Sequence, residues 1–261
     1  MEKFDYSKND IIQALLKVGV CKYDNIFVHS NLGFFGKLKD GISKEDYCNA
    51  FKEAILEVIG INGTLVVPAF SYSFCNNEVY DKNKIVGVRG MFSEFIREDH
   101  QSLRSDDANF SVVAIGKNAE YFTKDVPSHS FGKNSFWERF LNCNGKICNF
   151  NFDSGSTFIH YVEKLLNVRY RFDKGFRGKS MINDKEEDRM YYHFVYDLSK
   201  PTDVPDFTKF DKKAKELGLT KTVNLGKGQI VCISAHDTLE LIQKEIVNNP
   251  SFLIKGLDVL I

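Results

Sequence analysis

Residues 25–70 decide the fold, and they read NIFVHSNLGFFGKLKDGISKEDYCNAFKEAILEVIGINGTLVVPAF. The first five residues form an apolar run typical of a short buried strand, and residues 63–70 form a second such run. Between the two runs, Ser43 with Asp46 makes a helix-capping signal, apolar residues follow at helical spacing, and Gly60 ends the pattern. This strand, helix, strand order predicts a largely parallel sheet covered by helices, at least in the N-terminal half.

The rest of the chain continues the α/β pattern. A first helix is predicted from the capping signal at Ser7 and Asp10 up to Gly19. The charged run at residues 183–189 is interpreted as a hairpin tip or solvated loop, although its carboxylates could also meet a cationic ligand. Other helices are predicted at residues 91–96, 157–166 and 206–218 and from about residue 235, and other strands at residues 110–116, 145–150, 190–198 and 228–234.

Composition excludes several classes of protein. Lys plus Arg and Asp plus Glu both number 35, so the formal net charge is zero. The protein therefore has no overall positive field that would attract nucleic acid or an anionic membrane. A net charge of zero is still compatible with a locally acidic binding pocket. The 6 cysteines contain no C-x-x-C pair, so no metal site is expected. The N-terminus lacks the pattern of a signal peptide and no apolar run is long enough to span a membrane, which predicts a cytoplasmic protein with reduced thiols.

The strongest chemical signal is DSGSTFIHYVE at residues 153–163. It places His160 and Glu163 three residues apart, on one face of a predicted helix. A carboxylate beside an imidazole stabilises the imidazolium that forms when the ring takes a proton, so the pair could act as an oriented base. The alternative is a solvated surface pair, which the same spacing often produces. Phosphate-loop, dinucleotide-binding, zinc-protease and α/β-hydrolase motifs are all absent from the sequence.

Several segments together resemble one known family, the aminoglycoside 3-N-acetyltransferases. VHSNLGFFG at residues 28–36 is similar to the family's V-H-S-S-L segment, with Asn31 in place of a serine. GTLVVPAFSYS at residues 63–73 matches the G-T-L-x-x-P strand and the loop after it. TFIHYVE at residues 157–163 matches the T-x-L-H-x-x-E helix that carries the family's catalytic histidine and glutamate. The resemblance runs from about residue 7 to residue 254, and it also includes residues 104–116, 130–147 and 228–254.

The resemblance implies a fold and a reaction. The fold would be a layered α/β/α sandwich around a largely parallel or mixed central sheet, with residues 1–261 forming a single acyltransferase domain. The reaction would be transfer of an acetyl group from acetyl-CoA to an amino group on a sugar ring, by direct attack of the amine. His160 and Glu163 would together remove the ammonium proton, and Ser71 or a backbone N–H between Gly33 and Gly36 would stabilise the oxyanion.

The resemblance also implies binding residues. Four of the residues that would line the path of bound CoA could equally well have an ordinary structural role. These roles are a loop cap for Ser30, a core residue for Phe35 and Phe131, and a turn residue for Ser105. Small molecules are the expected partners, and a homodimer is one option for the assembly. The CoA path would be lined by Ser30, Phe35, Gly36, Ser71, Ser105 and Phe131, and the acceptor would contact Asp107, Asp153 and Thr157.

The acceptor is the least determined part of this prediction. Where aminoglycoside-modifying members usually carry H-P-T-H, residues 107–110 here read Asp-Ala-Asn-Phe. We therefore prefer a biosynthetic N-acyltransferase acting on an amino sugar or its nucleotide conjugate, with aminoglycoside modification as the alternative. A CoA-binding or sugar-binding relative without turnover is a third reading, and a Cys-His acyltransferase with a covalent intermediate is a fourth. Whether His193 or Tyr192 reaches the site is left open.

Overall fold

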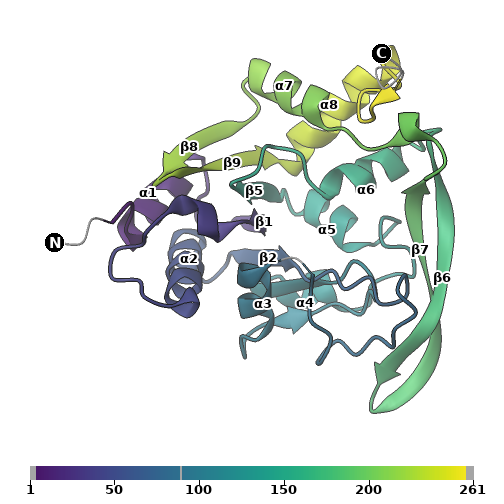
Figure 1. The fold of residues 1–261 in the computed structure, drawn as a ribbon, viewed down its shortest axis with the longest axis horizontal. Coiled ribbons are helices and arrows are strands. Elements are labelled where there is room, and N and C mark those ends of the chain that lie inside the picture. The colour runs from purple at the N-terminus through teal and green to yellow at the C-terminus, as the bar shows by residue number, and fades with distance from the viewer. Residues whose placement is uncertain (1–3, 89, 257–261) are drawn as a thin grey trace.

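A computed structural model describes residues 4–88 and 90–256 of the chain. Its centre is a seven-stranded sheet with the strand order β3-β4-β2-β1-β5-β9-β8 (Figure 1). A separate two-stranded hairpin, β6-β7, lies along one edge of the molecule. The strands are β1 (Asn25–Ser30), β2 (Thr64–Pro68), β3 (Leu103–Arg104), β4 (Val112–Gly116), β5 (Lys146–Phe150), β6 (Arg171–Ile182), β7 (Lys185–Tyr196), β8 (Lys221–Leu225) and β9 (Gly228–Ser234).

The central sheet is mixed. β1 pairs in parallel with β2 on one side and with β5 on the other. β4 and β9 pair antiparallel with β2 and β5, and β3 and β8 extend the two edges, also antiparallel. The parallel strand, helix, strand unit predicted from residues 25–70 is confirmed, and the strands added on either side make the whole sheet mixed.

Helices cover both faces of the sheet, which confirms the predicted α/β/α sandwich. Side chains alternate along a strand, so Ile26 and Val28 pack against one group of helices while Phe27 packs against the other. The first group contributes to one core cluster and the second group to another. The first group is α1 (Lys8–Lys17), α2 (Lys44–Ile59) and α3 (Met91–Arg97); the second is α4 (Ala119–Thr123), α5 (Phe136–Asn142), α6 (Phe158–Leu165), α7 (Thr208–Glu216) and α8 (Ala235–Asn248).

Local sequence signals agree closely with these elements. The capping boxes at Ser7 and Ser43 are both formed, each with the acidic residue three positions later. The run at residues 183–189 makes a hairpin turn at Asn183 and Asp184, and its remaining residues belong to strand β7. Strands β3, β6 and β8 and helices α4 and α5 were not predicted. In the described part of the chain, no helix combines the length and apolar character needed to cross a membrane.

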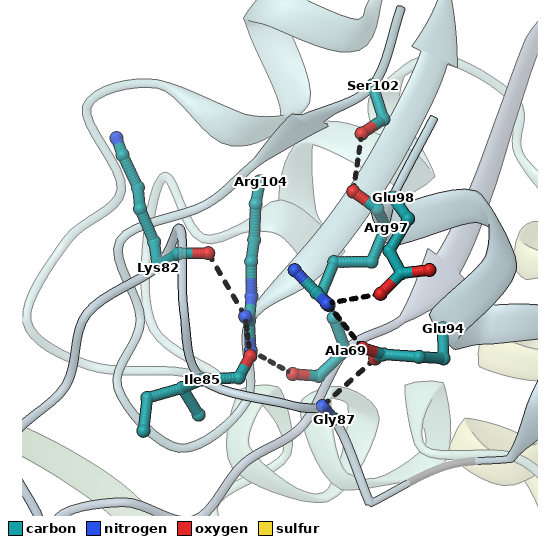
Figure 2. A network of polar contacts seen from close by, with 9 residues as sticks. All are labelled: Ala69, Lys82, Ile85, Gly87, Glu94, Arg97, Glu98, Ser102 and Arg104. Atoms are coloured by element: carbon teal, nitrogen blue, oxygen red, sulfur yellow. Dashed lines mark hydrogen bonds and ion pairs between the residues drawn. The ribbon is translucent and has the colours of Figure 1, made fainter. Parts of the chain in front are cut away.

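Arg104 fixes the long loop that leaves β2. Figure 2 shows its guanidinium donating hydrogen bonds to the carbonyl oxygens of Lys82, Ile85 and Ala69. The lengths are 3.1 Å to Lys82 O and 2.7 Å to Ala69 O. Glu94 of α3 accepts from the backbone N–H of Gly87 in the same network. A guanidinium offers five donors in a rigid plane, so one side chain can hold the start of this loop, at Ala69, to its later part, at Lys82 and Ile85.

Candidate functional site

Helix α6 presents the two residues singled out from the sequence. The chain leaves β5 at Phe150, and Asn149 donates from its side chain to the carbonyl oxygens of Asp153 and Gly155 in the loop that follows. This bracing sets where α6 begins. On its face, Nδ1 of His160 lies 2.7 Å from Oε2 of Glu163. The pair is therefore a formed contact, and the surface-pair alternative fails because the Glu163 side chain is fully buried.

Glu163 is held from three sides. Tyr170 donates its hydroxyl proton to Oε1 of Glu163 at 2.9 Å. Arg171, whose side chain is only 4% exposed, places Nε 2.8 Å from Oε2, and its Nη1 donates to the carbonyl oxygen of Phe194 at 3.0 Å. A buried carboxylate needs such partners, because burial without them is costly. The carboxylate of Glu163 is thus fixed in position before any substrate binds.

The electrostatics of the pair favour an ionised glutamate beside a neutral histidine. Burial acts to raise the pKa of Glu163, but the hydrogen bond and charge of His160 and the charge of Arg171 outweigh it, and the pKa is lowered. Burial, followed by the charge of Arg171, lowers the pKa of His160 despite the opposing effect of Glu163. Nδ1 of His160 also lies 3.1 Å from Nη2 of Arg171, a group that only donates, but its contact with the ionised carboxylate is shorter at 2.7 Å, and because a carboxylate only accepts we assign the ring proton to Nδ1. The lone pair of Nε2 is then available to take a proton from a ligand.

His160 lines a cavity of about 590 Å³. One wall is the β6-β7 hairpin, and the other walls come from the loops after β2 and β3, from the segment before α5, and from α6. Phe131 packs its ring 5.8 Å from the imidazole of His160. The lining is mainly aromatic and aliphatic, and it consists of Tyr72, Cys75, Phe110, Phe131, His160, Arg171, Phe172, Lys174, Phe176, His193, Phe194, Val195, Tyr196, Asp197, Leu198 and Pro205.

The chain as a whole matches one family of proteins. A family model described as aminoglycoside 3-N-acetyltransferase matches residues 27–246. The chain belongs to this family. Membership supports the aminoglycoside alternative better than the biosynthetic acceptor predicted from residues 107–110.

Individual aminoglycoside acetyltransferases are distant relatives of the chain. Aminoglycoside N(3)-acetyltransferase III of Acinetobacter baumannii is 23% identical over 188 residues, which cover 62% of this chain and 62% of that protein. The match therefore spans less than two thirds of that relative's length. Two solved structures, AAC-IIIb in a binary complex with CoASH and AAC-VIa bound to sisomicin, each give a TM-score of 0.77 at 20% identity, covering 92% of this chain and 97% of the other. These two likenesses establish the fold.

Of the residues predicted to bind CoA, some line the cavity and others do not. Phe131 lines the cavity with His160. Phe35 is fully buried and packs against Phe51 and Phe150, at ring distances of 5.1 and 6.2 Å, so it is a core residue. Gly36 adopts a φ of 87°, where a Cβ atom would lie 2.3 Å from the carboxylate of Asp5.

The three predicted serines lie outside the lining of that cavity. Ser30 is half-buried at the end of β1. Ser71 is buried and donates its hydroxyl proton to the carbonyl oxygen of Ala108 at 2.9 Å. Ser105 is buried and accepts from the backbone N–H of Val112 at 3.0 Å. Their role in holding CoA stays a proposal, and the hydroxyl proton of Ser71 is already engaged within the protein.

The residues predicted to contact the acceptor also lie outside the cavity lining. Asp107 is buried, and one of its oxygens accepts from the backbone N–H groups of Asn109 and Phe110, both at 2.9 Å. It therefore shapes the loop that carries Phe110 into the cavity. Asp153 is exposed and lines a different pocket, of about 250 Å³. Thr157 is half-buried at the N-terminus of α6.

Tyr170, Arg171 and His193 were missing from the predicted site. Tyr170 and Arg171 follow α6 and reach Glu163 by folding back beside it. Strand β6, which begins at Arg171, is mostly exposed and shows no alternation of apolar residues. No local pattern in the sequence therefore marked Tyr170 or Arg171, whereas His193 lies in the strand predicted at residues 190–198 and its place in the site was left open. In the described residues, no group of His, Cys, Asp and Glu side chains is arranged to hold a metal ion.

Proposed function

We propose that this chain is an acetyl-CoA-dependent N-acetyltransferase that modifies an amino group of an aminoglycoside. The observation that carries the proposal is the buried Glu163 holding His160 at the wall of a large cavity, with a 2.7 Å contact between them. Among its family relatives, AAC-IIIb has been solved with CoASH and AAC-VIa with sisomicin. Both ligands are the kinds of molecule that this reaction requires.

The arrangement suits a direct transfer. Sugar amines are largely protonated at neutral pH, and an ammonium cannot attack a carbonyl, so a base must take its proton. In this proposal Nε2 of His160 takes it, while Glu163 keeps the Nδ1 proton in place and stabilises the imidazolium. Acetyl-CoA supplies the activated thioester. The amine forms the new C–N bond and the C–S bond breaks. Of the two protons that the ammonium nitrogen loses in becoming an amide, one passes through His160 to the departing thiolate and the other is released to solvent, so protons and charge balance without a covalent enzyme intermediate.

One observation favours a second candidate acceptor. Among the described residues that line the cavity, Asp197 is the single carboxylate, whereas Arg171 and Lys174 are cationic. An aminoglycoside carries several positive charges and gains from facing carboxylates. The lining therefore favours an acceptor of lower positive charge, such as an amino sugar or its nucleotide conjugate. This biosynthetic role is the second candidate.

The test is release of the free thiol of CoA from acetyl-CoA by the purified protein. A panel of aminoglycosides and amino-sugar nucleotides is compared using wild type, His160→Ala and His236→Ala, the last removing an exposed histidine of α8. We expect turnover with an aminoglycoside that His160→Ala abolishes and His236→Ala preserves. Turnover with amino-sugar nucleotides alone selects the second candidate. Binding of CoA with no turnover on any acceptor contradicts both and supports a non-catalytic relative.

A further inference from the structure

His193 is a second histidine at the same cavity. It lies on β7, is only 2% exposed, and lines the cavity together with His160. Its ring packs edge-on to Phe110 at 4.9 Å and lies 4.8 Å from the ring of Phe176. An imidazole from a strand distant in sequence therefore lies against Phe110.

The hydrogen bonds of Asn109 determine which nitrogen of His193 carries the proton. The side-chain oxygen Oδ1 of Asn109 accepts from the backbone N–H groups of Phe74 at 3.0 Å and Cys75 at 3.2 Å. These two contacts orient the amide, so its Nδ2 must be the group that lies 3.0 Å from Nε2 of His193. An amide nitrogen only donates, so Nε2 accepts and the proton of the neutral ring is on Nδ1.

The Nδ1–H group of His193 has no acceptor within the described part of the chain, where the contact with Asn109 is the ring's one hydrogen bond. Burial lowers the pKa of His193 to about 4, although the charge of Asp107 opposes this and His129 adds to it. The ring is therefore neutral under physiological conditions. The ring lines the cavity, and Nδ1–H, its one N–H group, is not engaged by any described residue.

We propose, on the basis of the proposed function, that His193 donates its Nδ1–H to the thioester carbonyl oxygen and stabilises the charge that develops there during transfer. A carbonyl oxygen only accepts, so it matches a site that only donates. The donor expected from the sequence, Ser71, already gives its proton to Ala108. A donor held rigidly in apolar surroundings favours a developing oxyanion more than one in water does.

Other donors in the lining suit this role less well. Arg171 is engaged by Glu163 and by the carbonyl oxygen of Phe194. Lys174 is exposed, and its ammonium lies 5.1 Å from the centre of the Phe176 ring on a flexible side chain. Lys174 nevertheless provides a useful rival in the test, because its removal can be compared directly with removal of the His193 donor.

Two substitutions separate the donor role from a structural one. His193→Gln places an amide near Nε2, so it can keep the contact with Asn109 while losing the donor at Nδ1. His193→Asn places an amide nitrogen near Nδ1 and gives up the contact with Asn109. Tyr192→Phe, the exposed neighbour on the opposite face of β7, is the matched control.

We expect His193→Gln to keep the fold and lose about 10²- to 10³-fold in kcat, with the KM for acetyl-CoA little changed. His193→Asn should retain activity within about tenfold of wild type, and Tyr192→Phe within about twofold. Full activity in His193→Gln overturns the proposal, as does a change confined to KM. A larger loss of kcat in Lys174→Met than in His193→Gln assigns the donor to Lys174 instead.

A measurement independent of turnover keeps this inference apart from the proposed function. ¹⁵N NMR of histidine-labelled protein reports which ring nitrogen of His193 is protonated. We expect protonated Nδ1 and unprotonated Nε2 in the free protein, and a change at Nδ1 when acetyl-CoA is added. A proton on Nε2 overturns the assignment even if the enzyme is active. Inactivity of the wild type with every acceptor overturns the proposed function while the NMR result still decides the state of His193.

Discussion

Replacing Glu163 with glutamine removes one negative charge and almost no volume from the centre of the site. The amide oxygen of Glu163→Gln can still accept from Tyr170, so the shape of the pocket is preserved. The side chain of Arg171 is only 4% exposed and then lacks its counter-charge. Breaking a buried ion pair in this way costs about 3–5 kcal/mol, which should appear as a lower midpoint in urea unfolding.

The same substitution should impair catalysis more than binding. Without the carboxylate, the imidazolium formed on His160 loses its stabilising charge and its orientation. General-base assistance is worth about 10²- to 10⁴-fold, and we expect kcat for Glu163→Gln to fall within this range. Glu163 acts to raise the pKa of His160, so the residual activity of the variant should extend to lower pH than that of wild type.

Tyr170→Phe is the matched control, because it removes one hydrogen bond to Glu163 and leaves every charge in place. It should cost about 1 kcal/mol of stability and have a small effect on kcat. Steady-state release of CoA thiol and urea unfolding are measured for both variants. A Glu163→Gln enzyme that retains kcat within about threefold of wild type, while His160→Ala is inactive, would refute the role given to the carboxylate.

Three further predictions concern pH and thiol chemistry. Burial and Arg171 lower the pKa of His160, so the acidic limb of kcat/KM should lie below the ordinary value of 6.5, and a limb above it contradicts the assigned base. Burial and Asp107 raise the pKa of the Cys75 thiol, so iodoacetamide should react slowly near neutrality and faster as pH rises. The Cys75→Ser variant should keep its turnover. A loss of turnover in this variant would support the mechanism with a covalent cysteine intermediate. The pKa of His193 is about 4 in the folded protein and 6.5 ordinarily. Between these two pH values the unfolded chain binds a proton at His193 that the folded protein does not bind, so the free energy of unfolding decreases as pH falls from 6.5 to 4. At pH 4 the free energy of unfolding measured in urea should be lower by about 3 kcal/mol. The prediction is contradicted if the free energy of unfolding depends on pH equally in wild type and in His193→Gln.

The sequence by itself determined the local features of this protein. The capping boxes at Ser7 and Ser43, the strand, helix, strand unit of residues 25–70, and the facing of His160 and Glu163 were all predicted. Each depends on residues a few positions apart, whose geometry follows from the helix or strand that contains them. The family resemblance extended this to the layered fold.

The binding residues could not be fixed in the same way. Ser30, Phe35 and Gly36 occupy segments similar to those of the family, but whether such a side chain faces a cavity or the core depends on what packs over it. Phe35 packs against Phe51 and Phe150, which come from other elements. Ser71 similarly gives its proton to a loop far along the chain.

Only the tertiary structure decided what surrounds His160. Arg171 and His193 reach the cavity because β6 and β7 pair over 12 residues and lie against the end of the sandwich. Strand β6 and the first half of β7 are mostly exposed, so the periodicity of apolar residues that reveals buried strands is missing from them, and only the second half of β7 was predicted, at residues 190–198. Contacts along the chain follow from spacing, whereas contacts between distant segments follow from how whole elements pack. For that reason the pairing of His160 with Glu163 could be predicted from the sequence, whereas the contact of this pair with Arg171 is shown only by the tertiary structure.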